Sequence, residues 1–137
     1  MITVYKGVAH PWLCDIMGHM TTRHYVAMFD DASYHFLNEA LGWHPEDRSA
    51  PGWADVKHVI EYNDEVAAGS LLEIQGSIVR LGGKSITSRY EMHNLNKGTL
   101  AATLESTSVY FDLAARKSVP IPDELRERAK NYFDDVE

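Results

Sequence analysis

Residues 25–42, YVAMFDDASYHFLNEALG, decide the fold of this chain, because they predict one long amphipathic helix. Apolar side chains recur there three or four residues apart and form one stripe. The stripe comprises Tyr25, Met28, Phe29, Ala32, Phe36, Leu37, Ala40 and Leu41. Gly42 follows the last of them and predicts the end of the helix. A helix of about 18 residues is about 27 Å long, so its large apolar side chains need a broad apolar surface, which a sheet supplies.

The rest of the chain predicts that sheet. A first strand precedes the helix, apolar residues alternate in 56–62, 72–78 and 86–92, and a β-branched and aromatic run spans 99–111. Gly82-Gly83 predicts a two-residue hairpin turn with positive φ, and Asn96-Lys97-Gly98 predicts a second hairpin turn. Two successive hairpins imply an antiparallel meander, and Pro122 followed by acidic residues predicts a short second helix. The expected architecture is α+β, with about five antiparallel strands and one long helix.

The composition is that of an ordinary globular protein. The 137 residues are 45% hydrophobic and 24% charged, which suits a single domain over residues 1–137. The net charge of −7 argues against nucleic-acid binding, which depends on Lys and Arg at phosphates. Cys14 is the single cysteine, so no intrachain disulfide can form. Because we find neither an apolar signal-peptide core nor the roughly 18 apolar residues of a membrane span, we expect a cytoplasmic protein.

The segment that leads into the helix, residues 12–25 (WLCDIMGHMTTRHY), is where we expect the chemistry. It has no apolar periodicity, and loops held by rigid elements often carry function. A helix N-terminus presents unpaired backbone N–H groups and the positive end of the helix dipole, which stabilise an oxyanion. Asp15 is the acid of this loop. A carboxylate in that position can attack a thioester carbonyl or draw a proton from water.

Each of these residues also has a structural interpretation. Asp15 can serve only as a turn or capping residue, and His19 only as a structural or exposed histidine. Gly18 suits a tight turn. Tyr25 lies on the apolar stripe, so it belongs either to the core or to a binding site.

A resemblance to a known family favours the functional interpretation. The run Asp15-x-x-Gly18-His19-Met20, then Tyr25, Phe29 and Ala32, resembles the helix-entry motif of 4-hydroxybenzoyl-CoA thioesterase-like hotdog proteins. Similar segments follow in the family's order: residues 58–62 with Val66 and Gly69, Gly83-Lys84-Ser85, Tyr90-Glu91, and residues 117–122 with Leu125. The resemblance covers nearly the whole chain. It implies the hotdog fold, in which an antiparallel sheet wraps around one long helix.

The resemblance also implies an activity. Family members hydrolyse acyl-CoA thioesters, with an aspartate at the position of Asp15 acting as nucleophile or general base. A backbone N–H at the start of the helix polarises the carbonyl, and the spacing assigns that donor to Thr22. Many relatives carry two asparagines where this chain has Thr21-Thr22, so the backbone donor is retained but the side-chain amide is not. His19 is a secondary catalytic candidate.

Several further residues are candidates for substrate binding. Lys84, Ser85 and Arg89 lie in or just after a hairpin and suit the phosphates of CoA, with Arg80 and Lys97 as other options. The structural alternative for each is a solvated charge at a sheet edge. His58 and Tyr62 share one strand face and line either an acyl pocket, the core or a subunit contact. Gly18 and Tyr25 complete the set of substrate-binding candidates.

Other functional classes remain open at this point. Asp15 and His19 also suit a hotdog hydratase acting on an enoyl thioester, and a non-catalytic acyl-CoA-binding module would keep the pocket without needing Asp15. We expect no metal site, since no His-Glu-x-x-His or paired-cysteine pattern occurs. We expect no cofactor, because CoA is part of the substrate. One sheet around one helix leaves an open edge strand, so we expect a homodimer or homotetramer.

Overall fold

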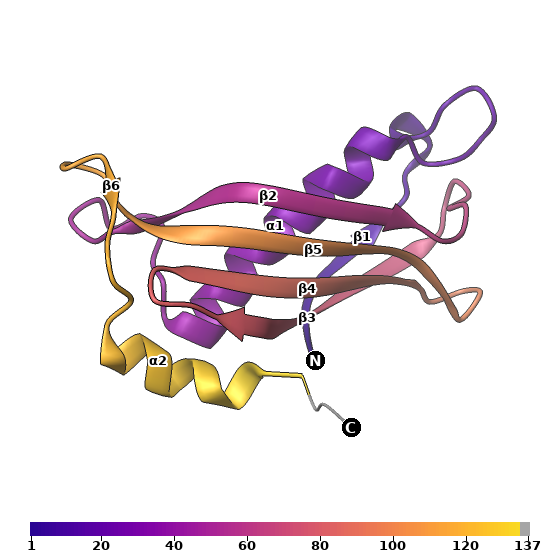
Figure 1. Ribbon diagram of the computed structural model, residues 1–137. Coiled ribbons are helices and arrows are strands. Elements are labelled where there is room, and N and C mark those ends of the chain that lie inside the picture. The colour runs from indigo at the N-terminus through magenta and orange to yellow at the C-terminus, as the bar shows by residue number, and fades with distance from the viewer. Residues whose placement is uncertain (135–137) are drawn as a thin grey trace.

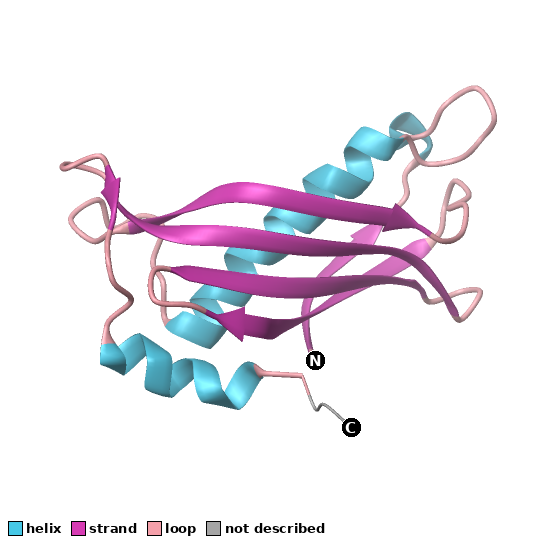
Figure 2. Cartoon of the chain, viewed as in Figure 1, coloured by secondary structure: helices cyan, strands magenta, loops and turns pink. Residues whose placement is uncertain are grey.

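The computed structural model describes residues 1–134 and places the helices and strands in the predicted order (Figure 1; Figure 2). The elements are β1 (Ile2–Val8), η1 (Pro11–Leu13), α1 (Thr22–Leu41), β2 (Gly52–Tyr62), β3 (Leu71–Leu81), β4 (Ser85–Asn94), β5 (Thr99–Asp112), β6 (Lys117–Ser118), α2 (Asp123–Ala129) and η2 (Lys130–Tyr132). The predicted α+β class is confirmed. The two-residue strand β6, which pairs with the end of β5, is an addition to the expected five strands.

The strands form one antiparallel sheet in the order β1-β3-β4-β5-β2. The predicted meander is confirmed, since β3, β4 and β5 follow one another through short turns. The two strands that precede it in the sequence lie at opposite edges: β1 pairs with β3, and β2 pairs with β5. β2 therefore forms a long edge whose outer side has no partner strand among residues 1–134.

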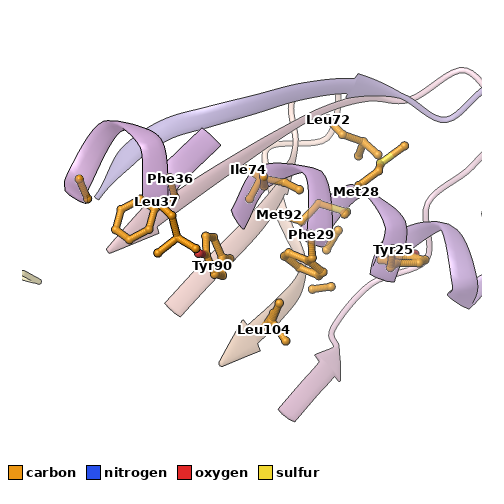
Figure 3. Packing of buried hydrophobic residues seen from close by; sticks show 14 of the residues in the cluster. Tyr25, Met28, Phe29, Phe36, Leu37, Leu72, Ile74, Tyr90, Met92 and Leu104 are labelled. Atoms are coloured by element: carbon orange, nitrogen blue, oxygen red, sulfur yellow. The ribbon is translucent and has the colours of Figure 1, made fainter. Parts of the chain in front are cut away.

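Helix α1 crosses one face of the sheet obliquely and packs its apolar stripe against it (Figure 1). All eight stripe residues are buried, as predicted. Figure 3 shows the larger ones, Tyr25, Met28, Phe29, Phe36 and Leu37, among side chains from three strands: Leu72 and Ile74 of β3, Tyr90 and Met92 of β4, and Leu104 of β5. The ring of Phe36 meets that of Tyr90 edge-on at 5.6 Å, a favoured aromatic geometry. The core therefore lies between α1 and the inner face of the sheet.

The predicted helix end and one of the two predicted turns are confirmed. Gly42 caps α1 in the left-handed region with φ 67°, and Gly98 adopts φ 69° in the β4–β5 turn. The prediction for Gly82-Gly83 is wrong in detail, because neither glycine has a positive φ and Lys84 also belongs to the turn. The Gly82 N–H donates instead to the Ser85 carbonyl at 2.8 Å.

The predicted alternation of 56–62 holds only in part. His58, Ile60 and Tyr62 do share the inner face, where they pair opposite Ser106, Leu104 and Ala102. Val56 does not pair, because the register with β5 shifts between Asp55 and Lys57. This bulge adds one residue to β2 and changes which side chains face inward upstream of it.

The two ends of the sheet carry different loops (Figure 1). The segment that enters α1, the loop between β2 and β3, and the β4–β5 turn gather at one end, on the right of the view. The loop after α1 and the β3–β4 turn lie at the other end. Within residues 1–134, no helix is both long enough and apolar enough to cross a membrane.

Candidate functional site

The segment that enters α1 folds into a small hairpin. The backbones of Cys14 and Met20 form an isolated antiparallel β-bridge. The Asp15 N–H donates to the His19 carbonyl at 2.9 Å. Gly18 closes the turn with φ +81°, and its N–H donates to the Asp15 carbonyl at 3.0 Å. Glycine suits this position because other residues are strained at that φ. The hairpin fixes the backbone that carries Asp15.

The carboxylate of Asp15 caps this turn. Its Oδ1 accepts the Met17 N–H at 2.8 Å and lies 3.4 Å from the His19 N. Its Oδ2 has no hydrogen-bond partner within the described part of the chain, and the residue is exposed. The structural role foreseen for Asp15 is thus present, and one carboxylate oxygen remains available for chemistry.

A second loop, residues 63–70, lies against this hairpin. The Met20 N–H donates to the Val66 carbonyl at 2.8 Å, and the Ala68 N–H donates to the Gly18 carbonyl at 3.1 Å. The side chain of His19 reaches Glu65, with Nε2 3.3 Å from Oε2. The two loops are therefore joined by backbone hydrogen bonds as well as by a side-chain contact.

A cavity of about 310 Å³ opens between these loops, the start of α1 and the end of β2. Its lining consists of Met17, His19, Met20, Thr22, Tyr25, Tyr62, Asn63, Asp64 and Glu65. Four of the predicted site residues, His19, Thr22, Tyr25 and Tyr62, thus come together there. Asp15 does not line the cavity. Its carboxylate accepts a hydrogen bond from the backbone N–H of Met17, and Met17 does line the cavity.

The N-terminus of α1 is open toward this cavity. Thr21, the N-cap residue, has φ −69° and ψ 143°, and no side chain caps the helix. Within residues 1–134, no acceptor pairs with the backbone N–H of Thr22. Such an N–H, together with the positive end of the helix dipole, can hold a developing negative charge on a ligand oxygen.

Two tyrosines form one wall of the cavity. The rings of Tyr25 and Tyr62 meet edge-on at 5.1 Å. Burial raises the pKa of Tyr25 above its usual value, the backbone of Val66 opposes this, and the charges of Asp64 and Glu65 add to it. The Tyr25 hydroxyl therefore stays protonated at neutral pH and remains a hydrogen-bond donor.

The structure does not gather the other predicted binding residues at this cavity within one chain. Lys84 and Ser85 lie in and just after the β3–β4 turn, at the opposite end of the sheet (Figure 1). Arg89 is on the outer face of β4, with Nη2 3.4 Å from Oε2 of Glu91. His58 lies further along the inner face of β2, with Nε2 3.5 Å from Oδ2 of Asp55.

Lys97, a further candidate for binding the phosphates of CoA, lies at the cavity rim. Its Nζ lies 2.8 Å from Oδ2 of Asp64, which lines the cavity. Hydrogen bonds from Lys97 and Thr99 lower the pKa of Asp64 below its usual value. The Asp64 carboxylate is therefore ionised at neutral pH.

Sequence reasoning missed the contribution of the second loop. Asn63, Asp64 and Glu65 form a polar run directly after a strand, and that position is the one signal that marks them. The contact between this loop and the Asp15 hairpin depends on the order of the strands in the sheet, which the sequence pattern does not give. Within the described residues, no group of three His, Cys, Asp or Glu side chains is arranged to hold a metal ion.

Comparison with known proteins gives a family and a fold. The family model described as the thioesterase-like superfamily matches residues 9–129. A hypothetical protein of Staphylococcus aureus, in complex with CoA, superposes with a TM-score of 0.84 at 19% identity, covering 97% of this chain and 86% of that one. A Pseudomonas aeruginosa protein gives 0.84 at 22% identity, covering 96% and 92%. A 1,4-dihydroxy-2-naphthoyl-CoA thioesterase from Synechocystis gives 0.80 at 16% identity, covering 95% and 96%.

These structural likenesses confirm the hotdog fold that the sequence predicted. A search of curated protein sequences finds no match to the chain.

Proposed function

The chain belongs to the thioesterase-like superfamily and is by that membership a thioester hydrolase, and we propose that it hydrolyses an acyl-CoA at the cavity beside α1. One observation carries this proposal. The unpaired N–H of Thr22 opens on the same cavity whose rim is built by the Asp15 turn. An oxyanion donor and a carboxylate are the two groups that thioester hydrolysis needs.

The roles follow from the chemistry of those two groups. The thioester carbonyl oxygen accepts the Thr22 N–H, which stabilises the negative charge as the carbonyl carbon is attacked. With Asp15 as general base, its carboxylate takes a proton from the attacking water. The tetrahedral intermediate then expels the CoA thiolate, the C–S bond breaks, and the thiolate recovers the proton from Asp15. With Asp15 as nucleophile, an anhydride forms first and water hydrolyses it.

The remaining cavity residues position the substrate. His19, held near Glu65, is the secondary candidate for proton transfer. Gly18 shapes the turn, and Tyr25 with Tyr62 forms an apolar wall for the acyl group next to the thioester. A cavity of about 310 Å³ suits a small or medium acyl group in this position.

We also propose that the protein is a homodimer, or a tetramer of such dimers, paired through β2. The edge of β2 lacks a partner strand within residues 1–134, and Val56 and Val59 on it are 60% and 44% exposed. Two copies that pair antiparallel through this edge place the start of one β2 beside the end of the other. The site then lies between subunits.

This pairing bears on how CoA binds. The β3–β4 turn lies at the same end of the sheet as the start of β2 (Figure 1). Pairing therefore brings Lys84 and Ser85 of one copy toward the cavity of the other, where Lys97 already stands at the rim. Arg89, on the outer face of the sheet, completes the proposed set of phosphate contacts. Cationic groups and hydroxyls of this kind bind phosphates.

The test is a panel of acyl-CoA thioesters assayed for release of free CoA thiol, with wild type and Asp15→Asn, which keeps an oxygen for the Met17 N–H. Hydrolysis by wild type that the substitution abolishes supports the proposal. Binding of acyl-CoA without hydrolysis by wild type contradicts it and leaves a binding module. Addition of water to an enoyl-CoA, with its thioester left intact, indicates the hydratase instead.

A further inference from the structure

Helix α2 lies beside the β3–β4 turn (Figure 1), and the side chain of Arg126 joins the two. Nη2 of Arg126 donates to the Gly82 carbonyl at 2.6 Å and to the Gly83 carbonyl at 3.0 Å. Its Nε donates to the carbonyl of Ile121, just before the helix, at 3.3 Å. The Ile121 N–H donates in turn to the Gly83 carbonyl at 3.0 Å. The guanidinium therefore ties the turn to the chain that leads into α2.

The other two carbonyl groups of this turn are hydrogen-bonded as well. The Tyr110 N–H donates to the Lys84 carbonyl at 2.8 Å, and the Gly82 N–H donates to the Ser85 carbonyl at 2.8 Å. All the carbonyl oxygens of residues 82–85 thus have a donor. None of them is left to present an unpaired partial negative charge to an anion that binds at the turn.

The same turn has backbone donors to spare. The N–H groups of Gly83 and Lys84 pair with no backbone acceptor within residues 1–134. A Cβ added at Gly83 would meet no atom within 4 Å apart from its chain neighbours, so the space beside this residue is open. Successive backbone N–H groups next to a lysine ammonium suit the binding of a phosphate.

Arg126 contributes charge to the turn in addition to hydrogen bonds. Neither Arg126 nor Lys84 forms an ion pair with a carboxylate in the part of the chain that the structure describes. Their two positive charges are therefore not cancelled at close range. A positive potential of this kind favours the approach of a phosphate.

We propose that Arg126 is a positioning residue for CoA binding, which holds the β3–β4 turn so that Lys84, Ser85 and the free N–H groups meet the phosphates of the acyl-CoA. The inference rests on the function proposed above, in which this turn of one copy lies toward the cavity of the other. Arg126 does not contact the substrate and acts through the turn. Arginine suits the role because its planar guanidinium donates in several fixed directions at once.

The test compares an acyl-CoA with the pantetheine thioester of the same acyl group, which lacks the nucleotide and its phosphates. We expect Arg126→Ala to raise KM for the acyl-CoA by about tenfold, the cost of weakening one charge-assisted hydrogen bond. KM for the acyl-pantetheine should stay within about twofold of wild type, and kcat for both within about threefold, because only binding of the phosphates is affected. A merely structural role would move both substrates alike.

Two further variants serve as controls. Arg128 is on the same helix, and its Nη2 donates to the Glu39 carbonyl at 3.1 Å. Arg128→Ala therefore also loses an arginine–carbonyl bond but leaves the turn intact, and it should keep the wild-type KM for both thioesters. In a Lys84→Ala background, Arg126→Ala should have a much smaller effect on the acyl-CoA KM, because residues that act through one another are not additive.

Several results would overturn the inference. Equal KM values of wild type for the two thioesters would do so and would leave thioester hydrolysis standing. An equal rise of both KM values in Arg126→Ala would give Arg126 a structural role alone. If Arg126→Ala does not fold, Arg126→Lys replaces it, since lysine lacks the fork of donors, and an unchanged acyl-CoA KM would contradict the positioning role. If wild type hydrolyses neither thioester, the proposed function fails, and calorimetric binding of CoA to wild type and variant still decides the inference.

Discussion

Oδ1 of Asp15 lies 2.8 Å from the backbone N of Met17, so the carboxylate assigned to catalysis also holds the turn that carries it. This double role makes alanine a poor probe of Asp15, because it removes the turn contact together with the charge. Asparagine keeps an oxygen for the Met17 N–H and removes only the carboxylate. The two roles can therefore be separated by experiment.

We predict that Asp15→Asn lowers kcat for acyl-CoA hydrolysis by about 10²–10⁴-fold, the usual contribution of a general base. Its melting temperature should stay close to that of wild type, because the turn is preserved. Thiol release and thermal unfolding measure the two effects. Wild-type activity in Asp15→Asn would leave Asp15 with a structural role alone.

We predict that Thr22→Pro lowers kcat by about 10²–10³-fold, the cost of one lost oxyanion donor. Proline is well tolerated at the first position of a helix, and Thr21 already has the extended conformation, with ψ 143°, that the residue before a proline prefers. Thr22→Ala is the matched control: it keeps the N–H and should retain activity within a few-fold. Equal activity of the two variants would exclude the Thr22 N–H as the donor.

We predict that Val59→Asp converts the protein to a monomer. A charge on the open β2 edge opposes the pairing of two copies, as natural sheet edges do. Val79→Asp is the control, because Val79 on β3 is 45% exposed against 44% for Val59. Light scattering at micromolar concentration reports the mass. A wild type that is itself a monomer, or a Val59→Asp variant that still dimerises, contradicts pairing through β2.

We predict that Gly42→Ala lowers the free energy of unfolding by about 1 kcal/mol, because a side chain is strained in the left-handed conformation. Gly42 has φ +67°, and an added Cβ would lie 3.1 Å from the Nη1 atom of Arg128. Gly83 has no positive φ and no atom within 4 Å of an added Cβ, so Gly83→Ala should change stability by less than about 0.5 kcal/mol. Urea unfolding measures both, and equal losses would contradict the argument.

We predict that Asp30→Asn stabilises the protein at neutral pH. Burial holds the pKa of Asp30 above its usual value, so the folded state binds this proton more tightly than the unfolded state, and stability falls as the pH rises through that range. Below the ordinary Asp pKa of about 3.9, both states are protonated and the gain should vanish. Melting temperatures of wild type and variant across this pH range test the sign. A gain confined to acid would contradict it.

Local features of the sequence predicted the fold well. Each residue of the apolar stripe in 25–42 is buried, and Gly42 ends the helix. The turn at Gly98 and the start of the second helix at Pro122 also lie where expected. Helical periodicity and turn chemistry depend on residues close together in the chain, so they can be read without the tertiary structure. The prediction for the turn at Gly82-Gly83 is wrong because several turn types accept glycine at these positions. Contacts with the neighbouring backbone decide which turn type forms.

The same distinction between local pattern and long-range contact applies to the candidate site. The sequence by itself determined that a carboxylate and a turn glycine, Asp15 and Gly18, precede a long helix, because these residues are neighbours in the chain. Only the tertiary structure decided that Glu65 meets His19 and that Tyr62 meets Tyr25. Those contacts require β2 to lie at the sheet edge beside β5. Strand partners and bulges arise from long-range pairing between complementary edges, and no local pattern encodes them.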